Sequence, residues 1–110
     1  MTRLGMSRAG AALHRALLAR VGKECDRILL SFWTSIDWRS LTFNGERHSI
    51  GLVATGPDAE QLSRRLLDGI EEAEFELPGH FLAEICRAGE LERRADGAVL
   101  IQLEALTIES

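Results

Sequence analysis

The chain has 110 residues, a length typical of one domain, and we expect a single domain over residues 1–110. Its hydrophobic content of 45% is enough for one core and excludes a disordered chain. The formal net charge of −4 argues against nucleic acid as a partner, because phosphate binding needs a concentrated basic surface.

The charges are unevenly distributed along the chain. Residues 1–23 contain five basic side chains and no acidic one, and the first acidic residue is Glu24. An Arg- and Ala-rich start without acids is also typical of a transit peptide. We interpret it instead as a basic first helix lying against an acidic body, because its apolar spacing continues into a foldable domain.

The sequence contains no apolar run approaching the ~20 residues of a membrane span and no signal peptide. Its two cysteines, Cys25 and Cys86, are too few for a disulfide framework and lack metal-ligand spacing. We therefore expect a cytoplasmic protein with reduced thiols, no membrane contact, no metal and no cofactor.

An amphipathic helix is predicted between Ala9 and Gly22, after a segment (1–7) that we expect to fray. Apolar residues recur there at intervals of three and four, which is the spacing of one helix face: Leu13, Leu17, Leu18 and Val21.

A β-hairpin is predicted next. Residues 28–36 and 38–43 are rich in β-branched and aromatic side chains, which favour strands. Asn44-Gly45 is a strong signal for a type I′ turn, since that turn needs positive φ at both central residues. The return strand is expected from Glu46 to about Thr55.

A second helix is predicted after Gly56-Pro57-Asp58, and two further strands follow it. The apolar stripe of this helix consists of Leu62, Leu66, Leu67 and Ile70. The strands are expected from Glu74 to about Ala88 and from Ala98 to Glu109, with a turn at residues 95–97.

The predicted order is αββαββ, which defines an α+β class. Two helices beside one sheet favour a two-layer sandwich, with both helices on one face of a four-stranded antiparallel sheet. A shift of 49 residues aligns the two helical stripes, so the halves could be a duplication. The alternative is that any two amphipathic helices of this length can be aligned in this way.

The sheet is predicted to have two apolar faces, of which the helices cover one. The uncovered face is expected to keep Leu82, Cys86 and Leu100, with Trp33 or Leu29. Several large apolar side chains left together favour a partner, and we expect a homodimer joined through the sheets. The alternative is a set of scattered surface residues, which is normal on any protein.

Candidate chemistry centres on His80, which follows a predicted kink at Leu77-Pro78-Gly79. Glu76, Glu84 and Cys86 are expected on its face of the strand. A histidine beside carboxylates can act as a general acid or base, and a His–Cys pair can form a nucleophile. Cys86 lies six residues from His80, ~20 Å along an extended strand, so a direct contact would need the kink or a second subunit.

The other candidate residues are His48 and Trp33. We interpret His48 first as a hydrogen-bonded structural residue and second as a catalytic one. Trp33 is interpreted first as a core or interface residue and second as the wall of a ligand pocket. The sequence contains no phosphate-binding loop and none of the motifs CxxC, HExxH or GxSxG.

The sequence does not specify a function. Our leading hypothesis is a non-enzymatic homodimeric domain that binds a partner protein or a small apolar ligand, with His80, Glu84, Cys86, His48 and Trp33 as candidate binding residues. The alternative is a small enzyme that uses His80 with Glu84 or Glu76 as general acid and base.

Overall fold

The computed structural model describes residues 6–110 and confirms an α+β class with an antiparallel sheet. In chain order the elements are α1 (Arg8–Ala19), the 3-10 helix η1 (Gly22–Arg27), β1 (Ile28–Arg39), β2 (Asn44–Ala54), α2 (Ala59–Leu67), the 3-10 helix η2 (Ile70–Glu72), β3 (His80–Arg87), β4 (Glu92–Arg93) and β5 (Val99–Glu109). The short strand β4 and both 3-10 helices were not predicted.

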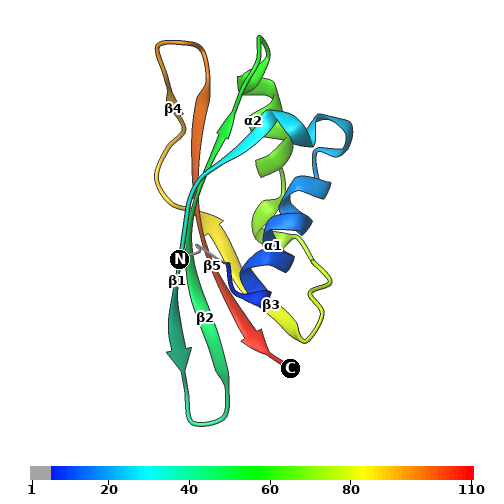
Figure 1. The fold of residues 1–110 in the computed structure, drawn as a ribbon, viewed down its shortest axis with the longest axis vertical. Coiled ribbons are helices and arrows are strands. Elements are labelled where there is room, and N and C mark those ends of the chain that lie inside the picture. Colours follow the sequence, from blue (N-terminus) through cyan, green and yellow to red (C-terminus); the bar gives the residue numbers. More distant parts are fainter. Residues whose placement is uncertain (1–5) are drawn as a thin grey trace.

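The sheet has the strand order β1-β2-β5-β3, and β4 pairs with the remaining end of β5. Every pairing is antiparallel. The strand order places β2 and β5 in the centre, and these two strands come from different halves of the chain. Figure 1 shows α1 and α2 on the same side of the sheet. No helix among residues 6–110 is long and apolar enough to span a bilayer.

The core lies between the helices and the central strands. The predicted helical stripes are buried there, and they pack on the alternate residues of β2 and β5 that face them. The most deeply buried members are Leu13, Leu17, Leu62, Leu66, Ile50, Leu52, Ile101 and Leu103.

Both main helices begin and end close to their predicted limits. The side chain of Ser7 caps α1 by accepting a hydrogen bond of 3.0 Å from the Gly10 amide, so this residue does not belong to a frayed segment. Residues 1–5 of that segment lie outside the described residues. The second helix ends at Leu67, before Gly69 with φ of +68°, and Ile70 remains buried in η2.

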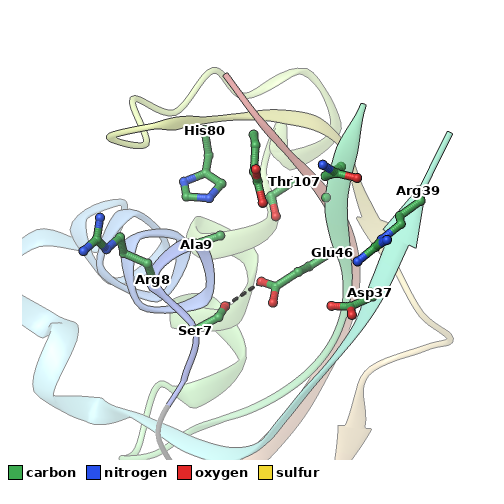
Figure 2. A pocket seen from close by; sticks show the side chains of 11 residues that line it. Ser7, Arg8, Ala9, Asp37, Arg39, Glu46, His80 and Thr107 are labelled. Carbon is green, nitrogen blue, oxygen red and sulfur yellow. Dashed lines mark hydrogen bonds between the residues drawn. The ribbon is translucent and has the colours of Figure 1, made fainter. Parts of the chain in front are cut away.

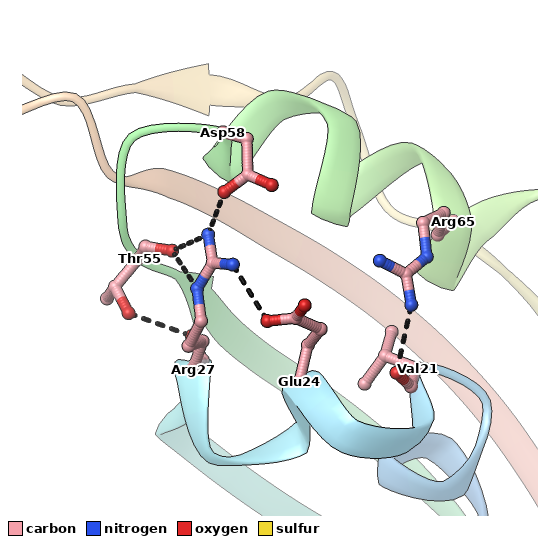
Figure 3. Close-up of polar contacts among 6 residues, drawn as sticks. All are labelled: Val21, Glu24, Arg27, Thr55, Asp58 and Arg65. Atoms are coloured by element: carbon pink, nitrogen blue, oxygen red, sulfur yellow. Dashed lines mark hydrogen bonds and ion pairs between the residues drawn. The ribbon is translucent and has the colours of Figure 1, made fainter.

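Arginine side chains connect the two halves of the helical layer. The guanidinium group of Arg27 donates to the Thr55 carbonyl at 2.8 and 3.0 Å and also contacts Glu24 and Asp58 (Figure 3). The hydrogen bond from Arg27 holds the pKa of the Asp58 carboxyl group below its usual range. Arg65 donates to the carbonyl of Val21 at 3.0 Å, so the two residues that flank or end η1, Val21 and Arg27, are bonded to α2 and to its N-cap residue.

The predicted turn at Asn44-Gly45 is wrong, because both residues are paired strand residues. Gly45 lies opposite Trp38, and neither position has positive φ. The chain reverses at residues 40–43 instead, where the Ser40 hydroxyl accepts hydrogen bonds from the Thr42 and Phe43 amides. Hydrogen bonds to a serine side chain thus stabilise this turn, in place of the positive φ angles expected at Asn44-Gly45.

The predicted strand from Glu74 is also shorter than expected. Leu77 to His80 form a tight turn in which Gly79 has φ of +77°, and β3 starts only at His80. A register shift at Ala83 then changes the phase of the strand. Leu82 and Ile85 therefore face the helices, whereas Phe81, Glu84 and Cys86 face away from them.

A second register shift at Ser31 changes the phase of β1. Leu29, Phe32 and Ile36 consequently share one side, although strict alternation along the strand would place Leu29 opposite the other two. We call the sheet surface that faces away from the helices the open face. Its members are Leu29, Phe32, Thr34, Ile36, Trp38, Gly45, Arg47, Ser49, Gly51, Val53, Phe81, Glu84, Cys86, Leu100, Gln102, Glu104, Leu106 and Ile108.

Candidate functional site

A polar cavity of about 300 Å³ lies between the N-terminus of α1 and the ends of four strands. Figure 2 shows that several charged side chains point into it from different elements. Its lining consists of Ser7, Arg8, Ala9, Asp37, Arg39, Asn44, Gly45, Glu46, His80, Thr107 and Glu109. The cavity therefore brings together three carboxylates, two guanidinium groups and one imidazole.

Ser7 and Glu46 form the contact between the helix and the strand in this cavity. The Ser7 hydroxyl donates a hydrogen bond of 2.6 Å to Oε1 of Glu46, while its oxygen caps α1 (Figure 2). One side chain therefore fixes the start of the helix and orients a carboxylate.

His48 lies beneath this carboxylate and is fully buried. Its Nδ1 accepts a hydrogen bond of 3.2 Å from the indole N–H of Trp33, and the Ser35 hydroxyl lies 2.7 Å from the same nitrogen. Because an indole can only donate, Nδ1 carries no proton. The proton is therefore on Nε2, which lies 2.9 Å from the hydroxyl of Thr107.

The electrostatics of His48 agree with this neutral tautomer. Burial lowers the pKa of His48, and the nearby Glu46 carboxylate opposes this only in part. The carboxylate oxygen lies 3.9 Å from Nε2, which is beyond hydrogen-bond distance. In this geometry His48 is a neutral, buried residue that is hydrogen-bonded at both ring nitrogens.

Trp33 occupies the space between two histidines on the helix side of the sheet. Its ring meets those of His14 and His48 edge to face, at centroid distances of 5.8 and 5.7 Å. Burial, followed by the charge of Arg15, lowers the pKa of His14. Trp33 thus connects α1 to the sheet and packs against the core.

His80 is the candidate residue that the structure places in the cavity wall. It pairs with Glu109 in the sheet, and both residues line the cavity together with Glu46. Its Nδ1 lies 3.1 Å from the Pro78 carbonyl, which can only accept, so this nitrogen is the protonated one. In the neutral form of the ring, Nε2 is then the acceptor nitrogen.

Glu84 and Cys86 do not share the face of His80, contrary to the sequence analysis. The shift at Ala83 turns both of them to the open face, on the other side of the sheet. Burial and the carboxylates of Glu104 and Glu84 raise the pKa of the Cys86 thiol, which disfavours the thiolate. The structure therefore does not assemble a His80–Cys86 nucleophile.

Sequence reasoning missed the carboxylates that accompany His80. Nothing in the sequence linked Glu46 to His80, and Thr107 and Glu109 were not singled out. The cross-strand register supplies this link, because Glu46 lies opposite Thr107 and Glu109 opposite His80. Among residues 6–110 no group of three or more His, Cys, Asp or Glu side chains is placed to hold a metal ion.

Comparisons with known proteins do not extend this description. No protein-family model matches the chain, and no curated protein matches its sequence. What the structure shows is the class, an α+β protein with an antiparallel sheet, together with the open face and the polar cavity.

Proposed function

We propose that this chain is a two-layer αββαββ interaction domain that forms a homodimer by packing the open face of its sheet against that of a second copy. The supporting observation is a set of large apolar side chains on that face. Leu29, Phe32, Ile36 and Phe81 are between 40% and 65% exposed there. Burying one such side chain contributes about 1.5–3 kcal/mol, so several together favour association.

Three aromatic side chains, Trp38, Phe43 and Phe81, gather at one end of this face. Phe81 meets Phe43 from the turn after β1 edge to face, with ring centroids 6.4 Å apart. Trp38 lies in the same cross-strand row as Phe81 and is separated from it by Gly45 and the buried Ile108. Aromatic clusters of this kind are enriched at the energetic centres of protein interfaces.

The charges of the open face suit a second copy of the chain. Arg47 lies in the same cross-strand row as Glu84, and Glu104 lies one row away, next to Cys86. A two-fold axis through the face can therefore place the Arg47 of each copy beside the carboxylates of the other.

The second copy is a better occupant than a small apolar ligand. The cavity beside α1 is lined mainly by charged and polar side chains, whereas ligand pockets are lined predominantly by apolar ones. The exposed apolar groups lie on the open face instead.

Light scattering with the variant Phe81→Glu tests the proposal. At micromolar concentration we expect the wild type to have twice the chain mass of 12.2 kDa, and Phe81→Glu to have the single-chain mass. A buried carboxylate without a partner opposes association strongly.

Leu41→Glu is the matched control. Leu41 is also a large apolar residue and is fully exposed, but it lies at the tip of the turn beyond the paired strands. We expect this variant to keep the wild-type mass. A wild type that stays at 12.2 kDa, or a Phe81→Glu variant that associates like the wild type, contradicts the proposal.

The second candidate is acid–base catalysis in the polar cavity, which is favoured by the presence of His80 with Glu46 and Glu109 in one wall. These carboxylates replace Glu84 and Glu76 as the proposed partners of His80. Product formation from a panel of simple esters and phosphoesters should then be lost in His80→Gln and retained in His14→Gln.

A further inference from the structure

The outer edge of β1 is unusually well suited to pairing with another strand. Within the described residues β1 ends the strand order, and its first nine residues, Ile28–Ile36, contain no proline and no charge. Edge strands are normally protected from pairing with another chain by charged residues, by proline, by bulges or by a short length. The opposite edge strand, β3, has only eight residues, and the shift at Ala83 and the charged Glu84 interrupt its middle. In the longer β1 the shift at Ser31 lies near the start and the charges, Asp37 and Arg39, lie at the end, so the segment from Phe32 to Ile36 is uninterrupted.

The hydrogen-bond pattern identifies which backbone groups of β1 point outward. The Ser40 amide donates to the Phe43 carbonyl at 2.9 Å, so these two residues form a hydrogen-bonded pair at the end of the hairpin. Antiparallel pairs alternate, and the register is uninterrupted from Arg39 to Phe32. Phe32, Thr34 and Ile36 are thus bonded to β2. The N–H and C=O groups of Trp33, Ser35 and Asp37 point away from it.

We propose that β1 pairs antiparallel with the β1 strand of a second copy, across a two-fold axis at Ser35, so that the two sheets become one. In this register Phe32 lies opposite Trp38 of the second copy, and Thr34 lies opposite its Ile36. Aromatic and β-branched pairs of this kind stabilise neighbouring strands.

The charges of β1 are compatible with this register. Its only charged residues are Asp37 and Arg39, which have opposite signs. Asp37 lies opposite the second copy's Trp33, and Arg39 lies opposite its Ser31. No like charges meet, so the strand is complementary to itself in backbone and side chains.

The edge contact is separate from the open-face contact of the proposed function and does not depend on it. Pairing two edge strands buries less apolar surface than packing two sheet faces, and a two-stranded contact alone is marginal in water. We therefore expect the open face to associate at micromolar concentration and the edge to pair at millimolar concentration.

Residue-level hydrogen exchange in the Phe81→Glu variant tests the edge contact where the open face is blocked. The outward amides of Trp33, Ser35 and Asp37 should exchange about tenfold more slowly at millimolar than at micromolar concentration. The inward amides of Phe32, Thr34 and Ile36 belong to the same strand and should be slow at both concentrations. Concentration-independent exchange of the outward amides overturns the inference.

Asp37→Pro and Asp37→Ala form the matched pair of variants. Both remove the carboxylate, but only proline removes the outward N–H, and an edge strand tolerates proline where that group faces solvent. Asp37→Pro should abolish the concentration dependence at Trp33 and Ser35, whereas Asp37→Ala should keep it. Persistence in Asp37→Pro contradicts the pairing.

The inward amides show whether Asp37→Pro still folds. If they lose protection, Thr34→Lys replaces it, because the lysines of the two copies would lie diagonally across the axis, each opposite Ile36 of the other copy, and their repulsion should oppose pairing. The two proposals fail separately. If only the open-face contact is wrong, Phe81→Glu has the wild-type mass at micromolar concentration while its outward amides still respond to concentration.

Discussion

Two glycines of β2 are required by close approach of neighbouring groups rather than by a turn. A Cβ atom at Gly45 would lie 2.1 Å from the Thr107 carbonyl oxygen of β5. A Cβ atom at Gly51 would meet the ring of Phe32 at 2.2 Å. The first neighbour is the backbone of the paired strand β5, whereas the second is a side chain that is 40% exposed and can move.

This difference predicts unequal effects of the same substitution. Gly45→Ala should lower the free energy of unfolding by about 1–3 kcal/mol, because β2 and β5 must separate to admit the methyl group. Gly51→Ala should have a smaller effect, since the Phe32 ring can swing outward. In a Phe32→Ala background it should stabilise by about 0.5 kcal/mol, because alanine has less backbone entropy to lose. Urea denaturation measures all three, and equal losses at both glycines would contradict this interpretation.

His48 makes stability depend on pH. Burial lowers its pKa in the folded state below the usual 6.5, so the unfolded chain binds the proton more readily. Its contribution is complete above pH 6.5 and is lost as the pH falls toward the folded-state pKa, by at most about 1.4 kcal/mol per pH unit.

The variant His48→Gln isolates this effect. Glutamine can accept from Trp33 and donate to Thr107 but does not titrate in this range. Denaturation at pH 7.5 and pH 5 should show a larger loss of stability in the wild type than in His48→Gln. The His14 pKa is lowered as well, so the difference between the two proteins is the quantity to compare. Equal losses would show that His48 does not contribute.

At the scale of elements, the helices were predictable from the sequence and the details of the strands were not. Each helical stripe is buried as expected, because apolar spacing depends only on local geometry. The register shifts at Ser31 and Ala83 have no local signature, since each depends on how a neighbouring strand is paired. The hairpin turn moved from Asn44-Gly45 because the Ser40 side chain bonds two amides and Gly45 is needed against β5.

The candidate site was predictable only in part for the same reason. His48 is buried and hydrogen-bonded and His80 lines a cavity, but the carboxylates near His80 are not the ones expected. The shift at Ala83 removes Glu84 and Cys86, and the pairing with β5 supplies Glu109 instead. Cross-strand neighbours depend on register, which a single sequence does not specify.

The start of α1 offers a test of how one helix is attached to the sheet. Ser7→Ala removes the helix cap and the hydrogen bond to Glu46, so we expect a loss of about 1 kcal/mol in the free energy of unfolding. Ser7→Asn should retain most of the stability, because asparagine caps equally well and its amide can donate to the carboxylate. Thermal denaturation of the two variants distinguishes them. An unchanged stability in Ser7→Ala would show that the cap is dispensable.

At the scale of the whole molecule, the two sides of the sheet differ in how far their side chains are buried. On the helix side, the sheet packs against the helices through the apolar core, and hydrogen bonds join the side chains of Trp33, His48 and Thr107. The open face carries exposed apolar side chains on either side of the charged residues Arg47, Glu84 and Glu104. Because the helices stabilise the sheet from one side, the other side can serve association without contributing a second core.

This asymmetry predicts a thermal midpoint that depends on protein concentration. If the folded state is a dimer and the unfolded state is a single chain, dilution favours unfolding by mass action. The midpoint of the wild type should then rise by about 3–5 °C for each tenfold increase in micromolar concentration. Phe81→Glu should show a constant midpoint, and Leu41→Glu should behave like the wild type. A constant midpoint in the wild type would mean that the open face stays exposed in the folded molecule, since only a contact between copies links stability to concentration.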